Sequence, residues 1–376
     1  MDVFVIDISG KVNNYDCSLC NSLCKLADVT LVTQLDGLDY SDKIINLIRL
    51  VPNKYKSSES VVKRLVKSVE VIINYILVLI YILKKSPTIL HFQWFPFMEF
   101  CSLDNYYIKL IKILKPKQKI ILTIHNVYPH NMTQRSKENY KGRFMKMDRY
   151  IDHYIVHTES SMNEVVNEFG VISKRITVIP HGIFTPNFSF QKKCCPPGRN
   201  IIMYGNNSPY KGADILIDAL QLLPESERTK WNVVIAGRTS IDYLTLLESK
   251  AKGVNVKFIP SFVPDQQLYE MIDDADYIAL PYRAISQSGV LLLALYFNKP
   301  LLISNLPSFK ETLSGFTEDM FFESENSQSL AELIMRYSNG KIDIDRQKEI
   351  ISKLNEVYSW DESAKKTANV YDICSR

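Results

Sequence analysis

The stretch MYGNNSPYKGADILIDAL, residues 203–220, decides the fold of the second half of the chain. An apolar segment that predicts a strand ends at Gly205, a loop of small and polar residues follows, and an amphipathic helix pattern starts at Gly212. This order places the free amides of the first helical turn at the loop, where they can bind phosphate. The loop is not a P-loop, because Lys211 precedes Gly212 and no hydroxyl residue follows. It predicts an anion site at which Lys211 offers a point charge to a diphosphate.

The same alternation of strand and helix runs through the 376 residues of the chain. Predicted strands lie at 3–7, 29–33, 88–93, 119–125, 153–157 and 176–180, then at 200–205, 232–237, 255–260, 277–281 and 300–304. Predicted helices lie near 60–83, 98–114 and 159–169, then near 212–223, 240–251, 265–274 and 287–297. The pattern indicates an α/β protein of two doubly wound Rossmann-like domains, which we expect to face each other across a cleft.

One segment rich in proline, glycine and lysine breaks the alternation and predicts a linker at residues 184–199. We therefore expect an N-terminal domain over 1–183 and a C-terminal domain over 200–355. The last helix, 356–376, is expected to pack at the domain junction or to return to the N-terminal domain.

Composition is that of a globular protein, with 46% hydrophobic and 23% charged residues. The first residues, MDVFVIDISG, carry acids and lack a long apolar core, so they predict a first strand of a cytoplasmic protein and not a signal peptide. Seven cysteines, two of them adjacent, suggest reduced thiols. Cys17, Cys20 and Cys24 have a spacing that zinc could use, but they fall on one face of a predicted helix, which favours a buried helix face.

Charge is uneven along the chain. Residues 1–185 hold 24 Lys plus Arg and 17 Asp plus Glu, a net charge of +7, and the remainder has a net charge of −3. This basic half fits either an anionic membrane or substrate, or a set of ordinary solvated lysines. Within it, Val69–Leu83 is the most apolar run, too short for the ~20 residues that span a bilayer. A buried helix packed on the sheet is the preferred interpretation, and a helix in the membrane interface is the alternative.

A second predicted anion site lies at PYRAISQSGVLLLAL, residues 281–295. A strand ends there and a helix begins at Ser288, which leaves the amides of Gly289 and Val290 free at the first turn. With Lys211 and Arg283 nearby, the two loops suggest a diphosphate held between them.

Two histidines, His91 and His125, end predicted strands of the first half. We assign the functional role to His125, because the polar loop after it leaves room for a ligand and an imidazole exchanges protons near neutral pH. The pair Asp274 and Asp276 spells a DxD metal motif, but it lies between a helix and a strand, where aspartates usually cap or are solvated. No metal site is predicted.

The order TIHNVYPH, HTESSMNEVVNEFGVISKRITVIPHG, YGNNSPYKGADILIDAL and VPDQQLYEMIDDADYIALPYRAISQSGVLLLALYFNKPLLIS resembles the retaining glycosyltransferases of family 4, which have the GT-B fold. The resemblance covers nearly the whole chain and is strongest over about 120–312. Its specificity comes from the order and spacing of the motifs together. It implies that His125 contacts the transferred sugar and that Lys211 holds the donor diphosphate.

Two departures from the family pattern stand out. Asn206 and Asn207 occupy the region where an arginine is common, and Ile285 and Leu293 stand where the family has two glutamates. The resemblance is then to a branch whose SQSG loop serves the donor. The residues expected at the donor are Gly205, Asn206, Asn207, Arg238, Phe262, Val263, Arg283, Ser286, Gln287, Ser288, Gly289 and Val290. Those expected at the acceptor are Gly10, Asn13, Asn14, Tyr15 and His130, with Lys137, Lys141 and Arg143 near a lipid-linked diphosphate.

The resemblance implies a metal-independent hexosyltransferase that uses a nucleoside diphosphate sugar as co-substrate and needs no other cofactor. Its partners would be that donor, a glycan or lipid-linked acceptor, and an anionic membrane at the inner face of the cell, with no nucleic acid. A role in capsule or O-antigen polysaccharide biosynthesis follows as an expectation. The alternatives are a nucleotide-sugar epimerase of the same fold and a non-catalytic partner subunit.

Overall fold

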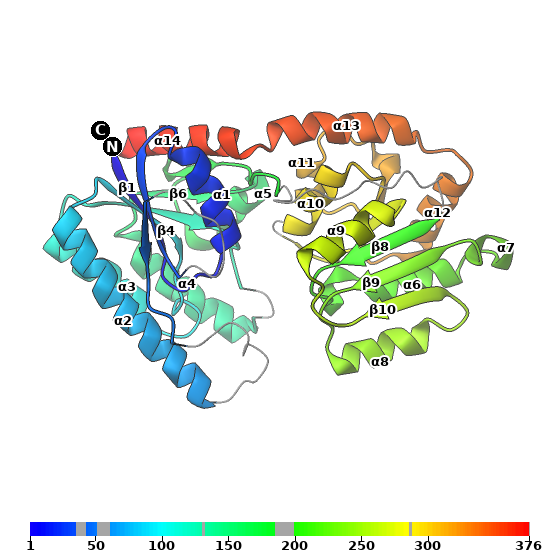
Figure 1. Ribbon diagram of the computed structural model, residues 1–376, viewed down its shortest axis with the longest axis horizontal. Coiled ribbons are helices and arrows are strands. Elements are labelled where there is room, and N and C mark those ends of the chain that lie inside the picture. Colours follow the sequence, from blue (N-terminus) through cyan, green and yellow to red (C-terminus); the bar gives the residue numbers. More distant parts are fainter. Residues whose placement is uncertain (35–42, 51–60, 130–131, 185–198, 286–287, 376) are drawn as a thin grey trace. The chain divides into compact units, whose positions relative to one another are not determined.

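The computed structural model describes residues 1–34, 43–50, 61–129, 132–184, 199–285 and 288–375. The chain forms two compact units (Figure 1). Unit 1 comprises Met1–Gly182 together with Tyr358–Arg376, and unit 2 comprises Ile183–Val357. Nearly all of the predicted linker lies outside the described residues.

Unit 1 is built on a parallel sheet with the strand order β3-β2-β1-β4-β5-β6-β7. The strands are β1 Asp2–Asp7, β2 Asp28–Thr33, β3 Ile44–Asn46, β4 Ile89–Trp94, β5 Lys119–Ile124, β6 His153–Val156 and β7 Ile176–Val178. Successive residues of β1 are buried on both faces, as a sheet covered by helices on both sides requires. The strand order reverses between β1 and β4, so the crevice that binds ligands in such sheets lies at their carboxyl ends.

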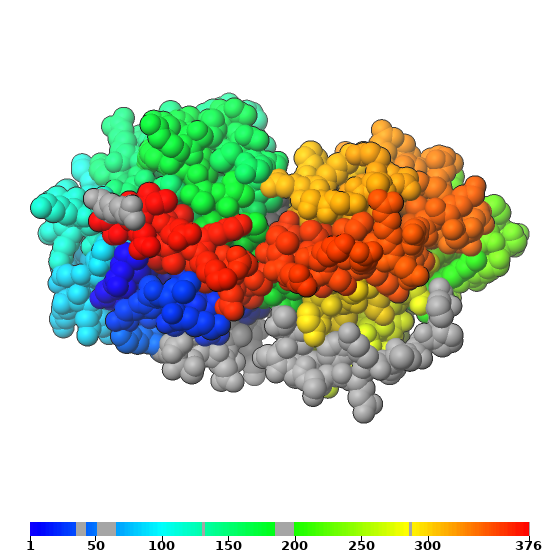
Figure 2. Space-filling view, turned by 90° about the horizontal axis from the view of Figure 1, so that it is seen from above, coloured from blue at the N-terminus to red at the C-terminus, as the bar shows by residue number. Residues whose placement is uncertain are grey.

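Helices cover both faces of this sheet. They are α1 Asn13–Leu23, α2 Val61–Lys85, α3 Leu103–Leu114, α4 Gln134–Asp148, α5 Glu159–Phe169 and α14 Trp360–Ser375. Helices α2 to α5 contribute to one apolar core with the even-numbered side chains of β1. Helix α14 packs beside α1, and Figure 2 shows it as a red surface layer next to the blue of α1. The C-terminal helix is therefore part of unit 1.

Unit 2 repeats the design with the strand order β10-β9-β8-β11-β12-β13, again parallel. Its strands are β8 Asn200–Tyr204, β9 Asn232–Ala236, β10 Asn255–Ile259, β11 Tyr277–Leu280, β12 Leu301–Ser304 and β13 Phe321–Phe322. Its helices are α6 Ala213–Gln221, α7 Glu225–Arg228, α8 Ile241–Lys250, α9 Asp265–Asp274, α10 Gly289–Phe297, α11 Pro307–Thr312, α12 Ser327–Ser338 and α13 Ile344–Val357. The order reverses between β8 and β11, which places the loops after these two strands on either side of the crevice.

Helix α2 differs from the prediction of a buried helix. One face lies in the core of unit 1, but six large aliphatic side chains on the other face are exposed. Among the described residues, Leu65–Lys85 is also the one segment long and apolar enough to cross a membrane by length and composition. The two polar residues that interrupt it, Glu70 and Asn74, are fully buried.

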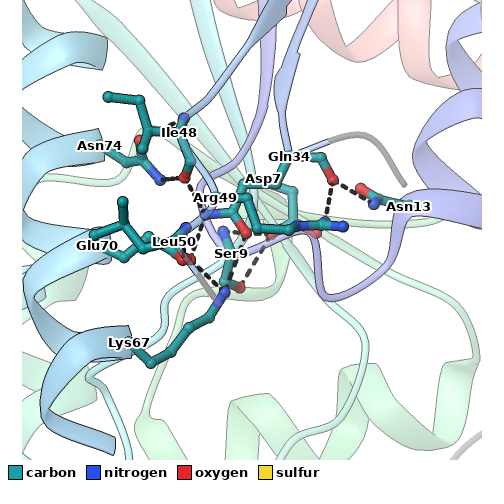
Figure 3. Close-up of polar contacts among 10 residues, drawn as sticks. All are labelled: Asp7, Ser9, Asn13, Gln34, Ile48, Arg49, Leu50, Lys67, Glu70 and Asn74. Atoms are coloured by element: carbon teal, nitrogen blue, oxygen red, sulfur yellow. Dashed lines mark hydrogen bonds and ion pairs between the residues drawn. The ribbon is translucent and has the colours of Figure 1, made fainter. Parts of the chain in front are cut away.

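These two side chains tie α2 to the segments that follow β2 and β3 (Figure 3). Glu70 accepts hydrogen bonds from the Gln34 side chain at 2.7 Å and from the Leu50 amide at 2.6 Å. Asn74 accepts from the Ile48 amide and donates to the Ile48 carbonyl, at 3.0 and 2.9 Å. A buried polar group costs little when it is hydrogen-bonded in this way, so both residues act as fasteners in an otherwise apolar helix.

The three basic residues expected near a lipid-linked diphosphate, Lys137, Lys141 and Arg143, lie on helix α4. Thr133 caps α4 by accepting the Ser136 amide. Arg143 donates to the carbonyls of Met98 and Glu99, at 2.7 and 2.8 Å, so it ties α4 to the segment after β4.

The two metal-like patterns of the sequence have structural roles. Cys17 and Cys20 are buried on α1, which confirms the predicted helix face. Asp276 accepts the backbone amide of Asn200 at 2.9 Å, as a residue between a helix and a strand commonly does. Within the described parts of the chain, no three His, Cys, Asp or Glu side chains converge as a metal site.

Candidate donor and histidine sites

Lys211 lies at the crevice end of the unit 2 sheet, between the loop after β8 and the start of α10. A Cβ added to Gly205 would be 2.8 Å from the Lys211 Nζ and 3.3 Å from Val290 Cγ2. The ammonium also lies 5.4 Å from the ring centroid of Tyr282. The structure thus brings together the two loops in which the sequence predicted anion sites.

Burial sets the protonation chemistry of Lys211. The side chain is only 5% exposed, and this desolvation lowers its pKa to about 8. The ammonium is still mostly charged at neutral pH, but it sits where water screens it poorly. An anion that reaches it would gain a strong interaction.

Glycines allow the crevice loops to pack backbone against backbone. Gly212 has φ +73°, and a Cβ there would lie 1.9 Å from the Pro281 carbonyl oxygen. Gly237, after β9, has φ +132°, and its Cβ would lie 2.0 Å from the Gly205 carbonyl oxygen. Both positions exclude a side chain, because of the left-handed φ and because of the close contact.

Two residues that were predicted to contact the sugar donor make hydrogen bonds within unit 2 that hold the crevice loops together. Asn207 is buried, and its amide group donates to the carbonyl of Gly237 and to Thr239, at 3.3 and 3.2 Å. Arg283 donates to both carboxylate oxygens of Asp214, at 3.0 and 2.7 Å. Its charge is matched by this bidentate partner, which ties the loop after β11 to α6, and its expected role as a diphosphate ligand stays a prediction.

The other predicted donor residues line the same edge of the sheet. Ser288 caps α10 by accepting the Leu291 amide at 3.1 Å, and Gly289 beside it is exposed. Arg238 stacks over the ring of Phe262 at 5.4 Å after β9 and β10, next to the buried Val263. Asn206 is exposed. Ser286 and Gln287 lie outside the described residues, as does His130 of the acceptor set.

His125, at the end of β5 in unit 1, belongs to a group of neighbouring histidines and aromatic rings. His157 ends the adjacent strand β6, and its Nε2 lies 3.2 Å from His125 Nδ1. The ring of Tyr15 meets the His125 ring edge-on, with centroids 4.7 Å apart. His181 and Trp360 complete the group around Tyr15.

The hydrogen bonds determine the tautomer of His125. His157 Nδ1 lies 3.0 Å from the Ile179 carbonyl, which can only accept, so this nitrogen carries the proton. Neutral His157 then accepts at Nε2 from His125 Nδ1–H. His125 Nε2 lies 3.3 Å from the side-chain oxygen Oε1 of Gln93. Because this oxygen only accepts, the Nε2 lone pair of His125 meets a donor there only when the Gln93 amide is turned over, so that its N–H faces His125.

Burial keeps these imidazoles neutral. It is the largest cause of the lowered pKa of His125, and the neighbouring histidines add to it. It also lowers the pKa of His157 to about 4. Burial thus favours the neutral imidazole of His125 as a hydrogen-bonding group over a group that exchanges protons near neutral pH.

The predicted acceptor residues are divided between surface and core. Asn14 is exposed, whereas Asn13 is held by Thr33 and the Gln34 carbonyl, both at 2.8 Å. Gly10 has φ +60° in the turn after β1. Tyr15 is 4% exposed and packs against the His125 ring, so its expected acceptor contact stays a prediction.

A cavity opens beside His125 at the carboxyl ends of β4 and β5. Its polar lining includes Gln93, Thr123, His125 and Asn126, and its apolar lining includes Trp94, Phe95, Met98, Tyr140, Phe144 and Met147. Such a cavity suits a group with hydroxyls on one side and an apolar flank on the other.

Two family models match the chain. The model described as Glycosyltransferase Family 4 matches residues 12–185, and the model described as Glycosyl transferases group 1 matches residues 187–354. The chain carries the two domains of a glycosyltransferase. Its fold is GT-B, with one Rossmann-like α/β domain in each unit.

Relatives of this glycosyltransferase chain are distant. A GDP-mannose:glycolipid 4-beta-D-mannosyltransferase of Xanthomonas campestris is 25% identical over 197 residues, which are 51% of this chain and 52% of the relative. The chain thus spans about half the length of that curated relative.

Solved structures match over the whole chain and show the fold alone. A glycosyltransferase from Rickettsia africae superposes with a TM-score of 0.70 at 16% identity, over 99% of this chain and 97% of the other. Anabaena Alr3699/HepE in complex with UDP also gives 0.70, at 14% identity, over 99% and 100% of the two chains.

Two contacts of His125 were missed by sequence reasoning. His157 had a signal, because HYIVH ends in a histidine just as KIILTIH does on the adjacent strand. Gln93 had none: its contact with His125 depends on the order of β4 and β5 in the sheet.

Proposed function

We propose that the protein transfers a sugar from a nucleoside diphosphate sugar to a hydroxyl group of a glycan or lipid-linked acceptor. The two glycosyltransferase domains support this reaction class. A nucleotide-sugar donor is supported by the name of the Xanthomonas relative and by the UDP named with the Anabaena structure. The glycolipid in that relative's name supports a lipid-linked acceptor.

One observation carries the proposal: a buried lysine beside the helix N-terminus of α10 at the sheet crevice. When the sugar leaves, the diphosphate gains negative charge. Lys211 and the amides of Gly289 and Val290 would stabilise that charge more in the transition state than in the ground state. Because these groups are fixed by the fold, they need little reorganisation during the reaction.

His125 would contact the transferred sugar through Nε2, with the sugar hydroxyl replacing the contact of this nitrogen with Gln93. A neutral imidazole in this tautomer accepts a hydrogen bond from a sugar hydroxyl, and the cavity beside it offers space for the group. His125 is therefore proposed as a positioning and hydrogen-bonding residue, with no proton exchange assigned to it.

Several finer points remain predictions. Retention of the anomeric configuration, a hexosyl donor, independence from metal ions, a cytoplasmic location and a role in surface polysaccharide synthesis follow from the family resemblance. Stereochemistry needs its own measurement, since the Xanthomonas relative's name specifies a β linkage. Proton NMR of the first-formed product, made in the presence of EDTA, tests retention and metal independence together.

The epimerase and the non-catalytic subunit are not favoured by the domain matches. An epimerase would convert the donor to an isomer with no acceptor present. A non-catalytic subunit would bind the donor and give no product with any acceptor.

The test is a panel of UDP, GDP and dTDP sugars, first by thermal shift and then by transfer to lipid-linked acceptors. Lys211→Ala should lower kcat/KM by about 10²-fold to 10³-fold, the loss typical of a removed transition-state contact. Lys257→Ala, an exposed lysine of β10 in the same unit, is the control and should be without effect. Full activity of Lys211→Ala would refute the proposed role of this lysine.

A further inference from the structure

The outer face of α2 is an exposed apolar row that the proposed reaction does not use. The row comprises Leu65, Val69, Ile72, Ile76, Ile80 and Leu83, which are between 40% and 62% exposed. Their spacings of three and four residues put them on one side of the helix. At 1.5 Å per residue the row is about 27 Å long.

This face is fixed in its orientation. On the opposite side of α2, Val71, Tyr75, Val78 and Ile82 lie in the core of unit 1. The buried hydrogen bonds of Glu70 and Asn74 hold the helix to the segments after β2 and β3 (Figure 3). One side of the helix is therefore packed in unit 1, and none of the described residues covers the exposed side chains of the other.

Helix α3 extends the apolar surface. It packs against α2 through the rings of Tyr75 and Tyr107, whose centroids are 4.2 Å apart, and through the hydrogen bond from Tyr75 to Asp104. Figure 1 shows both helices on the same side of the unit 1 sheet. Its exposed apolar residues are Tyr106, Leu110, Ile113 and Leu114. We call the two rows together the α2–α3 face.

The exposed charges that α2 and α3 themselves carry have one sign. The two acids of α2 and α3 are Glu70 and Asp104, and both are fully buried. The described exposed charges of the two helices are lysines, among them Lys84, Lys85 and Lys109. An apolar strip with a basic rim matches the arrangement of helices that lie in the headgroup region of a bilayer.

We infer that the α2–α3 face docks on an anionic lipid bilayer, with α2 lying in the plane of the interface. The aliphatic row would enter the acyl boundary, and the lysines would meet phosphate headgroups. A second copy of the chain fits less well, because pairing this face with itself would bring lysine rims together. Docking on the bilayer does not require sugar transfer. It rests on the proposed function in one respect, because a docked enzyme would meet acceptors that are linked to lipid.

The test uses the full-length protein and sedimentation with vesicles, without donor. Vesicles of phosphatidylcholine alone are compared with vesicles containing phosphatidylcholine and phosphatidylglycerol at about 7 to 3, which supply an anionic surface. The wild-type protein should bind the anionic vesicles and lose binding as salt is raised.

Ile72→Gln combined with Ile76→Gln should lower the partition coefficient at least about tenfold, because apolar contact area drives insertion. The matched control is Ile241→Gln in unit 2, an isoleucine that is 83% exposed and should leave binding unchanged. Lys84→Gln and Lys85→Gln should each lower binding to anionic vesicles about fivefold and leave the weak binding to neutral vesicles as it was.

Three results would overturn the inference that the α2–α3 face docks on a bilayer. Absence of wild-type binding, or equal losses in the Ile241→Gln control, would overturn the inference. So would a concentration-dependent dimer in ultracentrifugation that the Ile72→Gln, Ile76→Gln protein fails to form, since that result assigns the face to a second copy. Lys211→Ala should bind vesicles normally, so a failure of docking and a failure of the proposed transfer are seen separately.

Discussion

Burial lowers the pKa of a side chain at the crevice end of each sheet. At neutral pH one of these side chains stays charged and the other is neutral. In unit 2 it lowers the pKa of Lys211 from 10.5 to about 8, so the group remains a cation at neutral pH. In unit 1 it lowers the pKa of His125 from a starting value of 6.5, so that group becomes neutral. The choice of side chain, under one physical effect, thus leaves a buried cation in one unit and a neutral hydrogen-bonding imidazole in the other.

The backbone packing of unit 2 gives the largest expected effect. Gly212→Ala should destabilise unit 2 by about 3–5 kcal/mol, because it combines a left-handed φ with a Cβ 1.9 Å from the Pro281 carbonyl oxygen. Gly253→Ala is the control: its φ is +81°, but a Cβ there meets nothing within 4 Å, so the cost should be about 1 kcal/mol. Denaturant unfolding measures both, and equal losses would show that the close contact is unimportant.

The second largest effect is expected for the buried cation, Lys211. Lys211→Met should weaken nucleoside diphosphate binding at least about 100-fold and raise the unfolding free energy by about 1–3 kcal/mol, because a desolvated charge is removed. Calorimetry and thermal unfolding on one sample give the two numbers. A variant that loses both stability and affinity would instead make Lys211 part of the structural core.

Variants of His157, the neighbour of His125, test the neutral hydrogen-bonding site of unit 1. His157→Phe removes the acceptor for His125 Nδ1–H and should lower kcat about tenfold while KM for the donor stays within about twofold, as expected for a positioning residue. His157→Gln, which can still accept this hydrogen bond, should restore part of the rate. His153→Phe, at the start of the same strand, controls for the loss of a buried histidine.

Arg283 gives the smallest effect on ligand binding. Arg283→Ala should cost about 1–2 kcal/mol of stability through the lost pair with Asp214, and change nucleotide affinity less than about threefold. A loss of affinity above tenfold with unchanged stability would restore the role that the sequence suggested.

The sequence predicted the alternating elements and the position of Lys211 in the loop after β8, because hydrophobic period and loop composition are local signals. The position of Arg283 beside Asp214 could not be predicted: the two residues are 69 positions apart, and their contact depends on β8 and β11 being neighbours. The exposure of α2 was missed for a similar reason. Its pattern is apolar almost all round, and only the packing shows which side has a partner.

The most direct test of the central claim is the affinity for the preferred nucleoside diphosphate, measured by calorimetry from about pH 6.5 to about pH 9.5. The free lysine loses its proton above about pH 8, and bound diphosphate raises its pKa, so binding takes up a proton there. The dissociation constant should be constant below pH 8 and rise about tenfold per pH unit above it, with no such rise in Lys211→Met. A wild-type constant that stays flat to pH 9.5 would contradict the assignment of Lys211 as the cation of the donor site.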